Sequence, residues 1–182
     1  AWAEEYGARS VVVRRELAGA AQVQRAVHAG EEHCGGIDVL VNDAGRGWSG
    51  SIEGIDESSV RAMFELNFFA VLSVTRAVLP GMRARANGWI VNVSSVAGLV
   101  SAPGFGHYSA TKFAIEAITD ALRDEVAPHG ISVLTVEPGA FRTNAYAGFA
   151  NDPVVEPIPD YHDLLEQVRA AFVEMDGVQP GD

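Results

Sequence analysis

Short, almost uninterrupted apolar runs alternate along this chain with longer segments of helical periodicity. Four runs rich in β-branched residues are expected to be strands: SVVV from Ser10, IDVLVN from Ile37, WIVNVSS from Trp89 and ISVLTVEPG from Ile131. Strands without an alternating polar side are typical of a parallel sheet that is buried on both faces. The apolar pattern therefore predicts the central sheet of an α/β protein.

Helical patterns fill the intervals between these runs. They are expected at Ala20 to His33, at Asp56 to Met82 behind the capping sequence DESS, at about Gly106 to Pro128, and at Tyr161 to Glu174. The third helix is expected to pack through Phe113, Ala114, Ala117, Ile118, Ala121 and Leu122. This alternation predicts a doubly wound, Rossmann-like sheet with helices on both faces, a three-layer sandwich with its functional site at the carboxyl ends of the strands.

No linker, repeat or low-complexity tract divides the sequence, so residues 1–182 are expected to belong to a single domain. After Pro138 the chain mixes aromatic residues with Gly, Pro and Asn, and residues 140–160 are interpreted as a long loop beside a substrate. Loops of this length inside compact domains commonly act as lids or binding segments.

Composition narrows the classes of function. A net charge of −11 argues against a surface that neutralises phosphate backbones, so nucleic acid is not an expected partner. The longest apolar stretch, Leu66 to Met82, is interrupted by Arg76 and Pro80, and no membrane association is expected. Cys34 is the single cysteine, which fits a reducing, cytoplasmic setting. The five histidines show no metal-binding spacing, and no metal site is expected.

The segment GHYSATKFA contains the first candidate for chemistry, Tyr108 and Lys112. The chain has twelve arginines but one lysine, which would fall four residues after a tyrosine by chance about 2% of the time. At this spacing both side chains share a helix face, and the ammonium is expected to lower the pKa of Tyr108 from about 10, making the phenol a usable general acid or base. The alternative is a tyrosine that packs on the aliphatic part of the lysine.

Three other features carry both a functional and a structural interpretation. Ser94 and Ser95 end a predicted strand, where a hydroxyl can donate to a substrate oxygen or satisfy the turn backbone. Asn67 lies on the apolar side of a helix, where a buried structural hydrogen bond is the simpler explanation. The sequence GRGWSG, Gly45 to Gly50, matches G-x-G-x-x-G, but the next helix begins only at Asp56, so we interpret it as a flexible loop and not a phosphate cradle.

Taken in order along the chain, these motifs resemble the short-chain dehydrogenase/reductase family. They are Asn42-Asp43-Ala44-Gly45, Asn67, the NVSS run that ends at Ser95, Tyr108, Lys112 and PGAFRT. The resemblance covers essentially the whole chain. It implies an NAD(P)-dependent oxidoreductase that interconverts a ketone or aldehyde and an alcohol by hydride transfer, with NAD or NADP as cofactor and a homodimer or homotetramer as assembly.

The resemblance also implies roles for matching residues. Tyr108 would exchange a proton with the substrate oxygen, Ser95 would orient that oxygen, Lys112 would tune Tyr108 and hold the nicotinamide ribose, and Asn67 would fix a water in a proton relay. The residues implied to lie against the cofactor are Asn42, Ala44, Gly45, Tyr108, Lys112, Pro138, Gly139 and Thr143. Aromatic residues after Thr143 would face an apolar or ring-bearing substrate.

Two departures from the family pattern stand out. Asp43 replaces an asparagine that usually braces the sheet by hydrogen bonding in both directions. Neither the family's first strand with its glycine-rich turn nor its last strand has a counterpart, so the sequence is expected to be the middle of a longer protein, incomplete at both ends. A non-catalytic or fragmentary nucleotide-binding or assembly module is the alternative function. Epimerases or dehydratases of the extended branch, and enoyl reductases, match the motifs less well.

Overall fold

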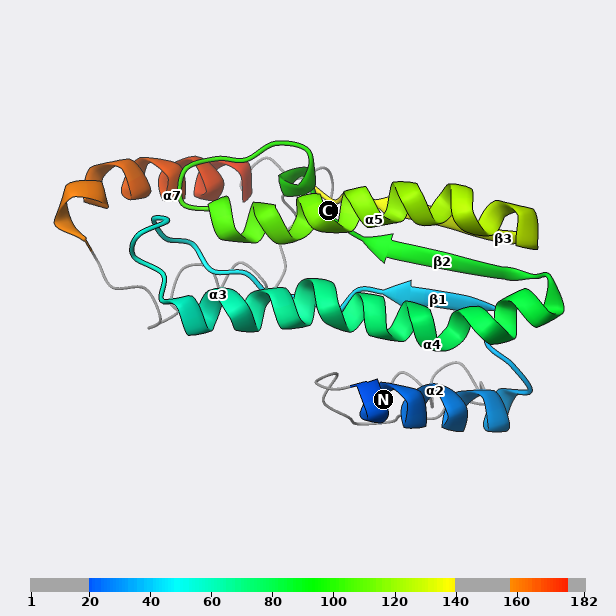
Figure 1. Cartoon of the computed structure of the whole chain (residues 1–182). Helices are drawn as coiled ribbons and strands as arrows, with labels where there is room; N and C mark the ends of the chain where they lie inside the picture. Colours follow the sequence, from blue (N-terminus) through cyan, green and yellow to red (C-terminus); the bar gives the residue numbers. More distant parts are fainter. Residues whose placement is uncertain (1–19, 140–157, 177–182) are drawn as a thin grey trace.

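A parallel sheet of three strands forms the centre of the computed structural model, which describes residues 20–139 and 158–176 (Figure 1). The strands β1 (Val39–Asn42), β2 (Gly88–Val93) and β3 (Ile131–Val136) pair in the order β1-β2-β3. Three of the four predicted strands are thus confirmed, with shorter ends. The predicted strand from Ser10 lies outside the described residues.

Five α-helices accompany the sheet in the described part of the chain. They are α2 (Ala20–Cys34), α3 (Glu57–Phe64), α4 (Ala70–Arg85), α5 (Gly106–Val126) and α7 (His162–Asp176). All four predicted helical segments are confirmed. The predicted helix from Asp56 to Met82 differs in one respect, because a π-helical turn, η1 (Glu65–Phe69), joins α3 to α4. There the Ala70 N–H donates to the Glu65 carbonyl, five residues back.

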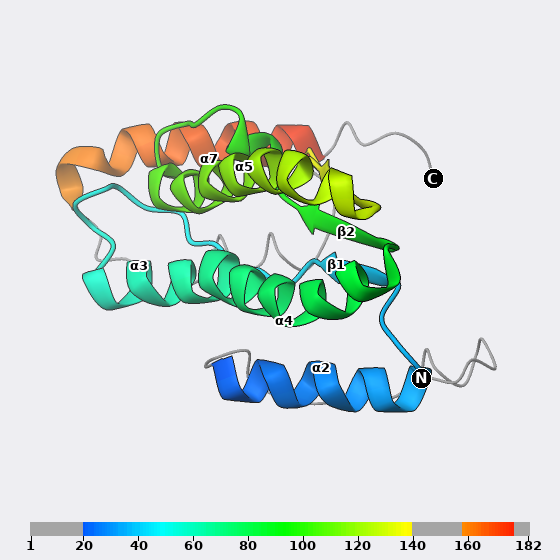
Figure 2. The same cartoon turned by 45° about the vertical axis from the view of Figure 1, so that its right-hand side comes forward.

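The hydrophobic core lies between one face of the sheet and the helices α4, α5 and α2. In Figures 1 and 2, α4 and α5 lie along the strands and α2 lies beyond α4. Its buried members are Val23, Val27, Val78, Met82, Ile90, Val126, Ile131 and Val133. Because Ile90 and Val133 are in register on neighbouring strands, their side chains share that face.

The opposite face of the sheet is open in the described structure. Val39, Val41 and Trp89 are 55%, 56% and 47% exposed, and Leu134 and Val136 are exposed as well. The alternation along β2 and β3 places these side chains away from the core cluster. The second helix layer of the predicted sandwich is therefore not among residues 20–139 and 158–176.

The predicted apolar face of α5 is only partly covered. Phe113 is 44% exposed, and Ala117 and Ala121 are exposed too, whereas Leu122 of the same face is half-buried and packs against the core cluster. The buried residues of α5 are Ser109, Thr111, Lys112, Ile115, Thr119 and Val126. Polar residues can occupy this face because their hydroxyls find acceptors in the helix: Thr111 donates to Tyr108 O and Thr119 to Ile115 O, each at 2.7 Å.

A chain of side-chain amides and hydroxyls connects the sheet to both covering helices. Asn42 Nδ2 donates to Asn92 Oδ1 (2.8 Å), and Asn92 Nδ2 donates to Thr119 Oγ1 on α5 (2.8 Å). Asn42 Nδ2 also approaches Thr75 Oγ1 on α4 at 3.4 Å. The exposed Asp43 takes no part in this chain, so its substitution for asparagine leaves these bonds intact.

One helical run among the described residues, Glu57–Arg85, is long and apolar enough to cross a membrane by length and composition alone. In this fold the run packs against α2, α5 and the sheet. Its buried residues include Met63, Val71, Val78 and Met82. The packing accounts for its apolar composition as that of a central helix.

Asp56 caps the first turn of α3, and this cap makes stability depend on pH. Its carboxylate accepts hydrogen bonds from Ser59 N (3.0 Å), Ser59 Oγ (2.6 Å) and Ser58 Oγ (2.5 Å), and these bonds lower its pKa from 3.8 to about 2. A depressed carboxyl pKa stabilises the fold above the unfolded value, and the contribution is lost as pH falls from about 4 to about 2.

Asp56→Asn keeps a capping oxygen but removes the charge. We expect urea melts to show a stability deficit at pH 6 that shrinks towards pH 2. Asp124→Asn, on an exposed position of α5, is the matched control for the same substitution away from a cap. An Asp56→Asn deficit that stays constant from pH 6 to pH 2 would show that the carboxylate charge contributes nothing.

Candidate active site

The carboxyl ends of the three strands bring most of the predicted site residues to one edge of the sheet. The turn Asn42–Gly45 follows β1, Ser94 and Ser95 follow β2, and Pro138–Gly139 follows β3. Two backbone bonds join the last two segments: Ser94 N donates to Val136 O (2.8 Å) and Val96 N to Pro138 O (3.1 Å). This edge is where ligands bind in open parallel sheets.

Ser95 connects the end of β2 to the tyrosine on α5. It has an extended backbone conformation before the 3₁₀ turn η2 (Val96–Gly98), and its Oγ accepts a hydrogen bond from Ala97 N at 3.1 Å. The same hydroxyl shares a hydrogen bond with the Tyr108 phenol. The predicted role of Ser95 as a turn residue is therefore confirmed, and its hydroxyl also lies beside the candidate acid-base residue.

Lys112 extends from the next turn of α5 into the same edge and is 7% exposed. Its Nζ donates to the Val93 carbonyl at the end of β2 (2.9 Å) and lies 5.7 Å from the centroid of the Tyr108 ring. Burial lowers the pKa of Lys112, while the charges of Asp43 and Glu116 oppose that decrease. The proximity predicted from the i, i+4 spacing is present.

The expected lowering of the Tyr108 pKa is wrong for this structure. Burial raises the pKa of Tyr108, and the hydrogen bond from Ser95 only partly opposes the increase. The reason is geometric, since the Lys112 ammonium donates to Val93 O and is itself desolvated. Tyr108 is therefore held as a neutral phenol, which is the form that can give a proton.

Asn67 lies in the π-helical turn, is 2% exposed and makes three direct hydrogen bonds. Its Oδ1 accepts from Arg46 N (2.9 Å), and its Nδ2 donates to Arg46 O (2.7 Å) and Thr111 Oγ1 (3.0 Å). The structural interpretation of this amide is thus confirmed. Both N–H donors of the amide are occupied by these bonds, so the side chain could contact a water only through the second lone pair of Oδ1.

No helix begins within Gly45–Gly50, as expected, but the segment is not a loose loop. Trp48 is 5% exposed and belongs to a buried cluster with Ile55 and Met63, against which Tyr108 packs. The Arg46 guanidinium lies 5.3 Å from the centroid of the Trp48 ring. The bulky residue thus fixes the loop beside the tyrosine.

The turn after β1 brings Gly45 close to Asn67 and Lys112. At Gly45 an added Cβ would lie 3.3 Å from Asn67 Oδ1 and 3.8 Å from Lys112 Nζ, so a side chain there would crowd the approach to Lys112. Asn42 is half-buried, while Ala44 and Gly45 are exposed along the edge. Thr143, the remaining predicted cofactor contact, lies outside the described residues, as do Phe141, Tyr146 and Phe149.

Sequence reasoning missed three polar residues that hold this site together: Asn92, Thr111 and Glu116. Asn92 is 1% exposed and Thr111 is fully buried. The charge of Glu116 raises the pKa of Lys112 and so opposes the effect of burial. Its position one turn after that lysine was the signal available in the sequence. Within the described ranges, no three His, Cys, Asp or Glu side chains lie close enough to hold a metal ion.

Comparison with known proteins agrees with this geometry. A family profile described as short chain dehydrogenase matches residues 1–153. A 3-ketodihydrosphingosine reductase of Bacteroides thetaiotaomicron is 43% identical over 121 residues, covering 66% of this chain and 45% of that protein.

Two solved structures extend the comparison. A short-chain dehydrogenase from Streptomyces avermitilis superposes with a TM-score of 0.85 at 38% identity, covering 100% of this chain and 65% of that one. A 3-ketoacyl-(acyl-carrier-protein) reductase from Brucella melitensis, complexed with NADH, gives a TM-score of 0.77 at 28% identity, covering 81% and 63%. The chain spans about half the length of the curated relatives it matches.

Proposed function

Because the chain belongs to the short-chain dehydrogenase family, we propose that its full-length protein is an NAD(P)-dependent oxidoreductase that interconverts a ketone or aldehyde and an alcohol. The observation that carries the proposal is the hydrogen bond between the Tyr108 phenol and the Ser95 hydroxyl at the ligand-binding edge of the sheet. Lys112, one turn further along α5, completes the group.

In the direction of reduction, the bound nicotinamide would supply a hydride to the carbonyl carbon. Ser95 donates a hydrogen bond to the carbonyl oxygen and orients it, which also stabilises the negative charge that develops there. Tyr108 transfers its phenolic proton to the same oxygen, so the product carries one new C–H bond and one new O–H bond. Tyr108 then regains a proton from solvent.

The residues described at this edge fit the nucleoside portions of such a cofactor. Lys112 has three N–H donors, of which Val93 O accepts one, and the others suit the vicinal hydroxyls of a ribose. The backbone from Asn42 to Gly45 would lie along the adenosine half, and Pro138 and Gly139 would flank the nicotinamide. The structural relative bound to NADH supports this class of cofactor.

The direct test is a substrate panel on the full-length protein. Aliphatic and ring-bearing ketones, aldehydes and secondary alcohols are assayed with NADH, NADPH and their oxidised forms, with the absorbance of the reduced nicotinamide as the signal. Turnover with one of the two cofactors is the expected result. If the protein binds neither cofactor in calorimetry, the alternative of a non-catalytic assembly module takes its place.

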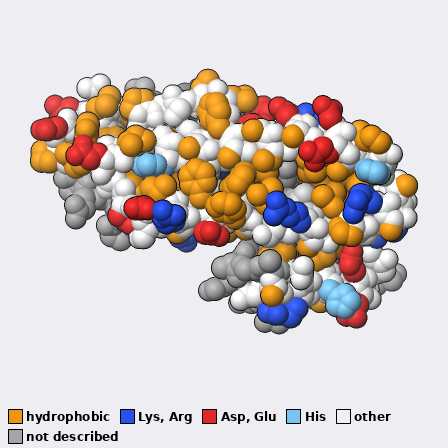
Figure 3. Space-filling model, in the orientation of Figure 1, with side chains coloured by type: hydrophobic (Ala, Val, Ile, Leu, Met, Phe, Trp, Pro, Cys, Tyr) orange, Lys and Arg blue, Asp and Glu red, His pale blue; other side chains and the backbone are white. Residues whose placement is uncertain are grey.

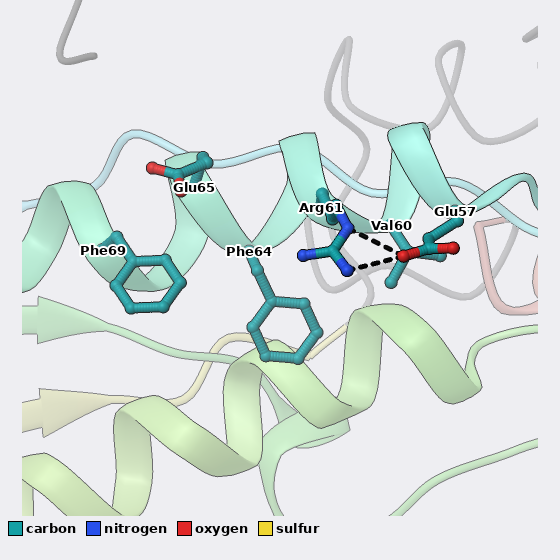
Figure 4. A pocket seen from close by; sticks show the side chains of 6 residues that line it. All are labelled: Glu57, Val60, Arg61, Phe64, Glu65 and Phe69. Carbon is teal, nitrogen blue, oxygen red and sulfur yellow. Dashed lines mark hydrogen bonds and ion pairs between the residues drawn. The ribbon is translucent and has the colours of Figure 1, made fainter. Parts of the chain in front are cut away.

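We further propose that the protein is a cytoplasmic homo-oligomer that buries the outer face of the α3–α4 run and α5. In Figure 3 hydrophobic side chains gather over these helices, and Phe69 and Phe113 are 46% and 44% exposed. Figure 4 shows that Phe64 and Phe69 line a hollow beside the ion pair of Arg61 with Glu57. A two-fold axis would let each copy fill the other's hollow.

Charge on this face should separate the subunits. We expect the double variant Phe69→Glu and Phe113→Glu to sediment as a monomer at concentrations where the unmodified protein is a dimer or tetramer. The control is Val100→Glu, which places the same charge on an exposed residue of the loop after η2. An unmodified protein that sediments as a monomer at every concentration would rule out this assembly.

A further inference from the structure

Most of the buried polar atoms without a hydrogen-bond partner lie at the end of β2 and on α5. Over the described residues four side-chain atoms are of this kind: Ser94 Oγ, Ser109 Oγ, Glu116 Oε1 and Thr135 Oγ1. The first three belong to the end of β2 and to α5, which packs closely against η2. Three of four such atoms on α5 or at the end of β2 indicate a polar site within this packing.

Gly98 shows how closely two of these atoms approach each other. An added Cβ at Gly98 would lie 2.7 Å from Ser94 Oγ and 3.1 Å from Glu116 Oε1, so the serine hydroxyl and the carboxylate both face this glycine. On α5, Ser109, Lys112 and Glu116 are spaced at i, i+3 and i+7, which puts them on one stripe. A side chain larger than glycine at position 98 would displace the carboxylate.

A buried carboxylate oxygen needs both a donor and a nearby positive charge. Leaving it unpaired costs free energy, and buried waters commonly satisfy such groups by bridging two or more polar atoms. Ser94, at 3% exposure, supplies one such atom from β2, and Glu116 supplies the other. The positive charge is Lys112, one helical turn before Glu116.

Few charged groups other than Glu116 act on this lysine. Asp43, after β1, has the larger effect of the two carboxylates that do so, and Tyr108 is the titratable group on the catalytic side. The elements β2, β3 and η2 carry no ionisable side chain. On the other elements that contact α5, the charged groups Glu57, Arg61 and Glu65 and the residue His129 are exposed. Both carboxylates counteract the effect of burial on the pKa of Lys112.

We propose that Glu116 is a positioning residue for Lys112: its carboxylate, one helical turn after the lysine and bridged to Ser94 by a buried water, supplies a counter-charge that holds the ammonium at Val93 O and the ligand edge. The inference rests on the proposed function for the role of Lys112 in the reaction. Glu116 itself contacts neither substrate nor cofactor in this proposal. Its effect passes entirely through the lysine.

The charge of Lys112 can be measured without any assay of activity. Lys112 is the single lysine of these 182 residues, so lysine labelled with ¹³C at Cε gives it a distinct NMR signal, which Lys112→Arg assigns in the full-length protein. In Glu116→Gln, we expect the pKa read from this signal to fall by about one unit or more, the usual effect of removing a close opposite charge. Glu125→Gln removes the same charge from an exposed site of α5 and should leave the pKa unchanged.

Equal Lys112 pKa values in Glu116→Gln and Glu125→Gln would overturn the proposal. If Glu116→Gln does not fold, Glu116→Asp keeps the charge but withdraws the carboxylate by one methylene, and it should lower the pKa of Lys112 by a smaller amount. Equal Lys112 pKa values in Glu116→Asp and in Glu125→Asp would equally refute the role of Glu116. Neither measurement depends on turnover. The role of Glu116 can therefore be tested even if the protein has no oxidoreductase activity.

Discussion

Replacing Tyr108 with phenylalanine is expected to lower carbonyl reduction by the full-length protein by about 10²- to 10⁴-fold, the usual contribution of a positioned proton donor. The ring packs beside the cluster of Trp48, Ile55 and Met63, and phenylalanine preserves those contacts. The substitution removes only the hydroxyl that bonds to Ser95. The thermal midpoint and cofactor affinity should therefore stay close to those of the unmodified protein.

Tyr161→Phe is the matched control, because it removes the same group from an exposed residue whose hydroxyl donates to Glu53 (2.9 Å). Its turnover should remain near normal. The pH profile gives a second readout: reduction needs the protonated phenol, so the rate should fall as pH rises through the elevated Tyr108 pKa. Near-normal reduction by Tyr108→Phe would remove the tyrosine from the mechanism.

The second large effect is expected on stability, from Asn92→Ala. Asn92 accepts from Asn42 on β1 and donates to Thr119 on α5, and it is 1% exposed. Alanine leaves the buried Asn42 donor and the Thr119 hydroxyl without these partners. Since each such loss costs about 1 to 3 kcal/mol, we expect the free energy of unfolding to fall by about 2 to 4 kcal/mol in urea melts.

Asn87→Ala, in the exposed turn before β2, should change the same free energy by less than about 0.5 kcal/mol. The comparison separates the effect of the buried network from that of losing an asparagine. A small effect of Asn92→Ala would mean that water enters and replaces the amide. In that case the connection between β2 and α5 would depend on apolar packing alone.

The sequence pattern predicted the elements well where short-range chemistry decides them. The β-branched runs became β1, β2 and β3, and the helix after Asp56 began at this N-cap residue. The pattern did not predict the π-helical turn at Glu65–Phe69. Asn67 in that turn bonds to Arg46 across the fold, and this long-range contact is not encoded in helical periodicity.

Hydrophobic periodicity did not predict which side of α5 is the most deeply buried, for a related reason. It ranks Phe113 and Ala117 above Thr111 and Thr119, but threonine hydroxyls bonded within the helix are buried at little cost, and Thr119 also serves Asn92. The candidate site was more predictable, because the i, i+4 spacing fixes Tyr108 and Lys112 on one face. The direction of the Tyr108 pKa was not predictable, since it depends on burial.

The burial of Lys112 also affects how the protein responds to amine-directed reagents. Succinimidyl esters and acetylating agents modify neutral ε-amino groups that are exposed to solvent. Lys112 carries the one ε-amino group of these 182 residues, because the other basic side chains are the twelve arginines and the histidines. Lys112 is 7% exposed and its ammonium is bonded to Val93 O, so acylation requires that this bond breaks. The acylation rate of Lys112 would then report how often its side chain leaves the end of β2.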